Sequence, residues 1–255
     1  MTIHVDALNG SNMNIKDDWK LEVTSAKTNR KIIHSDSQNP TDTGKLEQFI
    51  INYVEDDSKE LDNFIDSLVK EFDCPGLPNQ IFYKGIDSSQ AGNLRSKRIG
   101  PSPNPEDNRY SAKSEKCLYL IDNYDFLFEE IKPAPISICV QKYKTPLSEY
   151  KIADLSQNNK NLHNSLALAF DMAERGMTSS GYPFEEELKK RGKSRYKVSQ
   201  LLSSLFKRHG WEGFYIPGVH GLQGRHYHNL AIFNSIIDKW EKWTKGSYFL
   251  IVKKI

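Results

Sequence analysis

The spacing of apolar residues changes character along the chain, from a polar start, through two helical patterns, to a mixture of short strands and helices. Residues 1–43 are rich in Asn, Asp, Ser and Thr, and this composition is typical of weakly ordered chain. Within this segment Trp19, Leu21 and Val23 alternate with polar residues, which predicts one strand.

Two amphipathic helices are predicted after this polar segment, with Asp42 or Thr43 as the N-cap of the first. Cys74-Pro75-Gly76 is expected to end the second helix. We interpret residues 1–78 as an extension, partly a helical hairpin, that packs on or leads into the main domain. Its helical faces carry Leu46, Phe49, Ile50 and Val54, and then Leu61, Phe64, Ile65, Leu68 and Phe72.

The main domain is predicted to span residues 79–255 and to mix strands with helices. Because strands and helices alternate irregularly, without a repeating βαβ unit, the predicted fold class is α+β with a mixed sheet. Short β-type runs occur at residues 81–86, 117–121, 135–142, 150–155, 213–216, 229–234 and 247–253. Helical apolar stripes occur at Leu162, Leu166, Phe170 and Ala173, and at Val198, Leu201, Leu202, Leu205 and Phe206, where His209-Gly210 closes the helix.

Composition excludes several classes of protein. A net charge of +2 does not favour nucleic-acid binding, and 38% hydrophobic residues is ordinary for a globular protein. The first residues lack the pattern of a signal peptide, and no apolar run is long enough to span a membrane, so we expect a cytoplasmic protein. Cys74, Cys117 and Cys139 have no CxxC spacing, which argues against a zinc site or a disulfide framework.

Three residue types between positions 81 and 131 suggest a nucleotide site. Arg109 ends a long polar loop, Tyr119 lies in the next strand, and Glu130 ends a short helix, so the three could converge at one end of a sheet. Arg can pair with phosphate through two donors, and an aromatic ring can stack on a flat base. A carboxylate can hold ribose hydroxyls or stabilise an oxocarbenium ion. Glu129 is an alternative to Glu130, which the spacing before Ile131 favours.

Several short motifs follow one another in an order that resembles the RES domain, a family named for an Arg, a Glu and a Ser. The resemblance covers about the last two-thirds of the chain, and its motifs are individually weak but ordered. Its first half comprises Phe82-Tyr83-Lys84, Gly100-Pro101-Ser102-Pro103, Asn108-Arg109-Tyr110-Ser111, Leu118-Tyr119-Leu120 and Glu130-Ile131. Its second half comprises Tyr196-Lys197-Val198-Ser199-Gln200, Gly210-Trp211-Glu212-Gly213-Phe214, Pro217-Gly218-Val219-His220-Gly221 and Asn229-Leu230-Ala231-Ile232-Phe233.

The resemblance implies an ADP-ribosyltransferase-like fold and an enzyme that degrades NAD by phosphorolysis or hydrolysis, as do toxins of bacterial toxin–antitoxin pairs. NAD would be the substrate, inorganic phosphate a possible co-substrate, and an antitoxin a possible partner; no cofactor or metal is implied. Arg109 would hold the NAD phosphates or the attacking phosphate, Tyr119 would line the nicotinamide or ribose pocket, and Glu130 would stabilise the cationic transition state. The implied site residues are Lys84, Arg109, Tyr119 and Glu130 for catalysis, and Tyr83, Lys84, Arg109, Gly218, His220 and Asn229 for NAD binding.

Three positions depart from the family pattern. Lys84 stands where the family has Arg, and keeps the charge without the planar pair of donors. Gly218 stands in place of the family Ser, and His220 where an Arg is common. The departures at Lys84 and Gly218 motivate one alternative to NAD degradation, a catalytically weak module that binds a nucleotide or a partner. The other alternative is transfer of ADP-ribose to a macromolecule, with the basic run and the N-terminal extension serving target recognition.

Other features have structural interpretations that we weigh against functional ones. His220, His226 and His228 lack a carboxylate or Cys to complete a ligand set, so a metal site is disfavoured. The basic run at residues 189–197 predicts a solvated face, or else contact with an acidic or phosphate-rich partner. Trp240 and Trp243 are expected in the core. The N-terminal hairpin suggests a surface for self-association or a partner.

Overall fold

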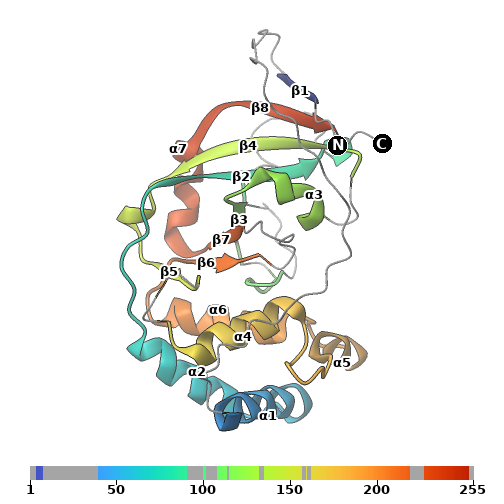
Figure 1. Cartoon of the computed structure of the whole chain (residues 1–255), viewed down its shortest axis with the longest axis vertical. Helices are drawn as coiled ribbons and strands as arrows, with labels where there is room; N and C mark the ends of the chain where they lie inside the picture. The colour runs from blue at the N-terminus through green and yellow to red at the C-terminus, as the bar shows by residue number, and fades with distance from the viewer. Residues whose placement is uncertain are drawn as a thin grey trace.

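The computed structural model describes residues 4–7, 40–90, 100–101, 108–113, 115–131, 135–156, 159, 162–218 and 227–252. Its centre is an eight-stranded sheet, with helices gathered at one end of the molecule (Figure 1). The strands and helices follow one another irregularly along the chain. The predicted α+β class with a mixed sheet is therefore confirmed.

The sheet has the strand order β1-β8-β4-β2-β3-β7-β6-β5. Among the strands described, β5 and β6 form the parallel pair and the other pairs are antiparallel. In the centre of the sheet β3 pairs with both β2 and β7, so that Ile121 lies opposite Tyr83 on one side and Asn229 on the other. The strands are β1 (His4–Ala7), β2 (Gln80–Asp87), β3 (Leu118–Ile121), β4 (Ser137–Thr145), β5 (Ile152–Asp154), β6 (Gly213–Pro217), β7 (His228–Ile232) and β8 (Thr244–Val252).

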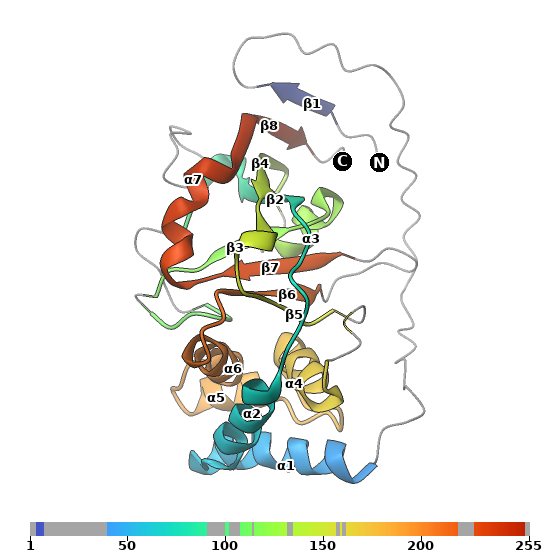
Figure 2. The same cartoon turned by 90° about the vertical axis from the view of Figure 1, so that its left-hand side faces the viewer.

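Most helices lie beyond the β5 end of the sheet, as the side view shows (Figure 2). There the large aromatic side chains of α6 and β6 pack edge to face, with Phe206 and Phe214 having ring centroids 5.1 Å apart. Alternation along β6 sends Phe214 and Ile216 to this core and Tyr215 to a second core on the other face. The helices are α1 (Pro40–Asp56), α2 (Glu60–Glu71), α3 (Leu127–Glu130), α4 (Asn164–Arg175), α5 (Phe184–Lys190), α6 (Lys197–Arg208) and α7 (Trp240–Trp243).

Helices α1 and α2 bury their apolar faces in the same core as α4 and α6. Leu46, Ile50, Leu61 and Ile65 are each fully buried there. The predicted amphipathic faces are thus the buried ones. The predicted N-cap at Asp42 or Thr43 is wrong, because the helix already begins at Pro40, and α2 ends at Glu71, before the predicted stop at Cys74-Pro75-Gly76.

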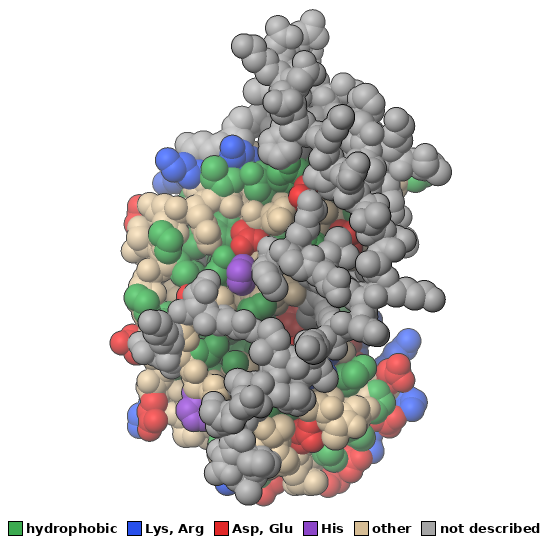
Figure 3. Space-filling model, viewed as in Figure 1, with side chains coloured by type: hydrophobic (Ala, Val, Ile, Leu, Met, Phe, Trp, Pro, Cys, Tyr) green, Lys and Arg blue, Asp and Glu red, His purple; other side chains and the backbone are tan. Residues whose placement is uncertain are grey.

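The basic run at residues 189–197 makes contacts within the chain. Lys193 and Lys197 both form ion pairs with Asp57 in the turn between α1 and α2, and the Arg191 guanidinium donates to the Glu55 carbonyl at 3.2 Å. Figure 3 shows acidic and basic side chains interspersed around this helical end. Through these contacts, the basic segment at residues 189–197 holds the region between α5 and α6 against α1 and the turn that follows it.

The predicted strands of the main domain all occur, with shifts of a few residues at their ends. Strand β1 and helix α5 were not predicted, and the strand predicted around Trp19, Leu21 and Val23 lies outside the described residues. Cys117, Cys139 and Trp243 are buried, as expected. Within the described residues, no helix is both long and apolar enough to cross a lipid bilayer.

Candidate active site

A pocket of about 260 Å³ opens where the middle of the sheet meets α3 and the C-terminal end of α4. Strands β2, β3 and β7 supply one wall, and the turn at 108–111 together with α4 supplies the other. Most of the predicted site residues line this pocket. They are Tyr83, Lys84, Arg109, Tyr119, Glu130 and Asn229.

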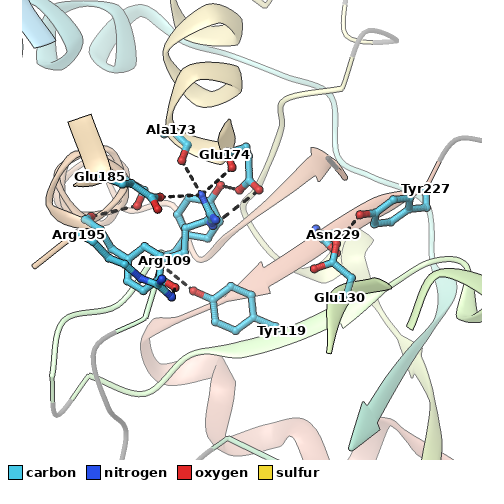
Figure 4. Close-up of polar contacts among 12 residues, drawn as sticks. Arg109, Tyr119, Glu130, Ala173, Glu174, Glu185, Arg195, Tyr227 and Asn229 are labelled. Carbon is cyan, nitrogen blue, oxygen red and sulfur yellow. Dashed lines mark hydrogen bonds and ion pairs between the residues drawn. The ribbon is translucent and has the colours of Figure 1, made fainter. Parts of the chain in front are cut away.

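Glu130 projects from the end of α3 and is held by two donors. Its Oε1 atom accepts hydrogen bonds from the Tyr227 hydroxyl and, at 3.2 Å, from the Asn229 side-chain amide (Figure 4). Two donors on one oxygen fix the orientation of the carboxylate. Glu130 lines the pocket and Glu129 is not among the lining residues, so the carboxylate at the pocket is the one that the spacing favoured.

Tyr227 is itself held by a stacked neighbour. Its ring lies on Phe126 with centroids 4.4 Å apart and planes inclined by 18°. The Gly218 amide donates to the Tyr227 carbonyl at 2.9 Å, and a Cβ atom at position 218 would overlap the Tyr227 ring. The tyrosine occupies the space that a side chain at position 218 would need.

The turn that carries Arg109 is fastened to α6. The Gln200 amide donates to the carbonyls of Asn108 and Ser111, at 2.9 and 3.2 Å. The Ser203 hydroxyl donates to the Tyr110 carbonyl at 2.7 Å. Gln200 belongs to one of the motifs identified in the sequence, and this contact gives that motif a structural role.

Arg109 points toward the C-terminal end of α4 and is engaged there. Its Nη1 atom donates to the carbonyls of Ala173 and Glu174, at 2.6 and 2.9 Å, and to Glu185 Oε1 at 3.3 Å. A cation near the last carbonyls of a helix is stabilised by the helix dipole. In this structure Arg109 therefore acts as a cap on α4, and its predicted role toward phosphate would require these contacts to be exchanged.

Glu174 also lines the pocket, although the sequence did not single it out. It is buried, accepts a hydrogen bond from the Tyr110 hydroxyl at Oε1, and lies with Oε2 3.8 Å from Arg109 Nε. Burial, helped by Glu185, raises its pKa to about 7 against the opposing effect of Arg109. The sequence does carry one indication of this role for Glu174. It follows Phe170 by four residues, which places it on the buried face of α4.

Lys84 is a partly buried cation on β2. Its Nζ atom donates to the Gly100 carbonyl at 2.7 Å, and burial lowers its pKa to about 8. Among the described residues, no carboxylate raises the pKa of Lys84 again. A cation with this environment is suited to an anionic ligand.

The aromatic residues contribute surface to the pocket. The Tyr119 hydroxyl accepts a hydrogen bond from the Tyr110 amide at 2.8 Å, and its ring stacks on Tyr110 with centroids 6.1 Å apart. Burial raises the pKa of Tyr119 well above its ordinary value, so this hydroxyl stays neutral. Tyr83 packs edge to face on Tyr124.

Two predicted binding residues are not among those that line the pocket. Gly218 is absent from the lining residues and contacts Tyr227 instead, while His220 lies outside the described residues, as does His226. His228 pairs with Asp122 at 3.0 Å and stacks on Tyr215. The described side chains include no cluster of three or more His, Cys, Asp or Glu arranged to hold a metal ion.

No family model and no curated protein matches this chain. A solved structure that is similar is a chain of the crystal structure of the M. tuberculosis MbcT–MbcA toxin–antitoxin complex. It has a TM-score of 0.40 and 10% sequence identity, and the match covers 75% of this chain and 90% of that one. A likeness of this size shows neither the family nor the activity of this chain.

Proposed function

We propose that the protein cleaves the bond between nicotinamide and ribose in NAD, with phosphate or water as the acceptor. The observation that carries this proposal is the Glu130 carboxylate, held by Tyr227 and Asn229 in a pocket that also contains the cation of Lys84. The resemblance of the pocket residues to the RES motifs supports NAD as the substrate.

The reaction requires the protein mainly to position the ribose and to stabilise the positive charge that develops on it. The pyridinium nitrogen of NAD is already cationic, so nicotinamide leaves as a neutral ring when it takes the electron pair of the C1′–N bond. Positive charge then develops on the ribose, and a fixed carboxylate stabilises it. Because Glu130 is oriented before the substrate arrives, it needs no reorganisation as the charge develops.

Lys84 is suited to the anionic parts of the reactants. A phosphate of NAD, or inorganic phosphate as co-substrate, would supply the counter-charge that this partly buried ammonium group lacks among the described carboxylates. The aromatic rings of Tyr83 and Tyr119 offer flat apolar surface for the base or the sugar. We therefore assign anion binding mainly to Lys84, because Arg109 is engaged with α4 and Glu185 in this structure.

The biological setting that we propose is a toxin of a toxin–antitoxin or defence system. Loss of NAD would itself be toxic to a cell, and an antitoxin would then be needed to block the pocket. This part of the proposal is supported by the resemblance to the RES family.

The test is NAD consumption by purified protein, with and without phosphate, for the wild type, Glu130→Gln and Glu129→Gln. Glu129 is a matched control because it is the neighbouring carboxylate on the same helix and is not a lining residue. We expect Glu130→Gln to lower turnover by roughly 100-fold or more and Glu129→Gln to have a far smaller effect. NAD left intact by the wild type would refute the proposal.

The engagement of Arg109 favours a second candidate, a module that binds a nucleotide without turnover. Two carboxylates and two carbonyls now surround this guanidinium, which is the arrangement of a structural arginine. Calorimetric binding of NAD, with no nicotinamide released and no labelled macromolecule formed, would identify this function. Label from NAD appearing on protein or nucleic acid would instead identify ADP-ribose transfer.

A further inference from the structure

We propose that Glu174 is the general base that activates water when water is the acceptor, an inference that rests on the proposed function. The pocket contains two carboxylates, Glu130 from α3 and Glu174 from α4. Figure 4 shows Glu174 at the end of α4 and Glu130 lower and to its right, with the Tyr119 ring below Glu174 in this view. Reactions at a glycosidic carbon commonly use two carboxylates with different roles.

The two carboxylates differ in what holds them. Glu130 Oε1 accepts from both Tyr227 and Asn229, so this oxygen already holds two donors. Glu174 accepts at Oε1 from the Tyr110 hydroxyl, while Arg109 Nε stands 3.8 Å from Oε2, beyond hydrogen-bonding distance. Oε2 is thus the oxygen that can accept a proton from water without first losing the hydrogen bond to Tyr110.

The surroundings of Glu174 match this task. The charged and titratable groups that face it are Arg109 and Tyr110 from the turn and Glu185 from α5. Burial and Glu185 raise the pKa of Glu174 to about 7 and outweigh Arg109. A base is most effective when its pKa lies near the working pH, so Glu174 is better suited than a fully solvated carboxylate.

The water oxygen bonds to C1′ of the ribose as the C1′–N bond breaks, and the electron pair of that bond neutralises the nicotinamide ring. The proton released by the water passes to Glu174 Oε2 and then to solvent. Phosphate dianion and azide carry a nucleophilic anionic atom with no proton to remove, so they need no base.

The distinguishing experiment compares acceptors for the wild type and Glu174→Gln. In water alone, we expect the variant to release nicotinamide roughly 100-fold more slowly than the wild type. With phosphate or azide we expect the variant to stay within about threefold of the wild type, because the base is not used. The products are ribosyl phosphate or ribosyl azide derivatives of ADP, which chromatography separates from ADP-ribose.

Glu185→Gln is the matched control. Glu185 also pairs with Arg109, at 3.3 Å, and is not one of the pocket-lining residues. Its substitution loosens Arg109 and removes a minor cause of the raised pKa of Glu174, but it keeps the proposed base, so the loss with water should be only slightly larger than the loss with azide. A selective loss with water in Glu174→Gln alone would separate proton transfer from the positioning of Arg109.

Equal losses with all acceptors in a folded Glu174→Gln, or no loss, would overturn this role while leaving NAD cleavage intact. If that variant does not fold, the pH profile of the wild type decides. Hydrolysis should then rise through pH 7 with a profile that the azide reaction does not share, and identical profiles would refute the role. A wild type that cleaves no NAD with any acceptor would refute the proposed function and this role together.

Discussion

A Cβ atom at Gly218 would overlap the ring of Tyr227. The ring cannot move freely, because it stacks on Phe126 and its hydroxyl donates to Glu130. The Ser of the resembling family therefore has no room at this position while Tyr227 keeps its place. Gly218 thus leaves room for the ring of Tyr227, and the hydroxyl of Tyr227 donates directly to Glu130, the candidate catalytic carboxylate.

Gly218→Ser should lower the free energy of unfolding by about 1–3 kcal/mol, because the added atoms force the Tyr227 ring from its place. Chemical denaturation measures the change. Gly76→Ser is the control, since a Cβ there meets no atom within 4 Å. In a Tyr227→Leu background the cost at position 218 should largely disappear, and a cost that stays the same would contradict the steric account.

Tyr227→Phe tests the second contact of the same ring. The stack on Phe126 can persist, but the hydrogen bond to Glu130 is lost. We expect NAD turnover to fall by roughly 10-fold, since Asn229 still holds the carboxylate, with stability lower by about 1 kcal/mol. Turnover and thermal unfolding measured on the same preparation separate the two effects. Unchanged turnover in an active enzyme would show that Tyr227 only packs.

Arg109→Met should destabilise the fold more than most substitutions of a charged residue. It removes the cap on α4 and leaves the buried Glu174 without its cation, for a loss of about 2–4 kcal/mol. Arg208→Met is the comparison, because Arg208 pairs with Asp62 and Asp66 on an exposed surface and should cost far less. Similar losses for the two variants would contradict a structural role for Arg109.

Lys84 makes stability depend on pH in a defined direction. Burial lowers its pKa from 10.5 to about 8, so between these values the unfolded chain binds the proton more readily than the folded protein does. The contribution of Lys84 to stability should therefore rise from pH 8 to pH 10.5, and Lys84→Met should remove about 2 kcal/mol of that rise. Denaturant midpoints across this range measure it.

Bound phosphate should raise the pKa of Lys84 and so counteract the effect of burial. An anion beside the ammonium group favours its charged form, so stabilisation by phosphate should weaken as the pH passes 8. Phosphate that stabilises Lys84→Met as much as the wild type would contradict anion binding at this residue.

Sequence patterns predicted the sheet and most helices because burial imposes a period of 2 or 3.6 on apolar residues. The apolar stripe from Leu201 to Leu205 is buried as expected, whereas β1 and α5 are short and carry little periodic signal. The grouping of Arg109, Tyr119 and Glu130 at one pocket could be predicted because a loop, a strand and a short helix carry them in order, whereas Lys84 was implied by the resemblance to the RES family. The role of Glu174 could not be predicted, because Tyr110, whose hydroxyl donates to it, lies 64 residues away in the chain.

The two walls of the pocket owe their shape to different kinds of bond. The wall made by β2, β3 and β7 is set by backbone ladders, which tolerate many side chains. The wall at 108–111 is set by a few side-chain bonds from Gln200 and Ser203, and by Arg109. Single substitutions in those few side chains would reshape the second wall and leave the first intact. Evolution of new substrate preferences in this scaffold should therefore concentrate on the turn and its helical supports, with the sheet as the invariant half.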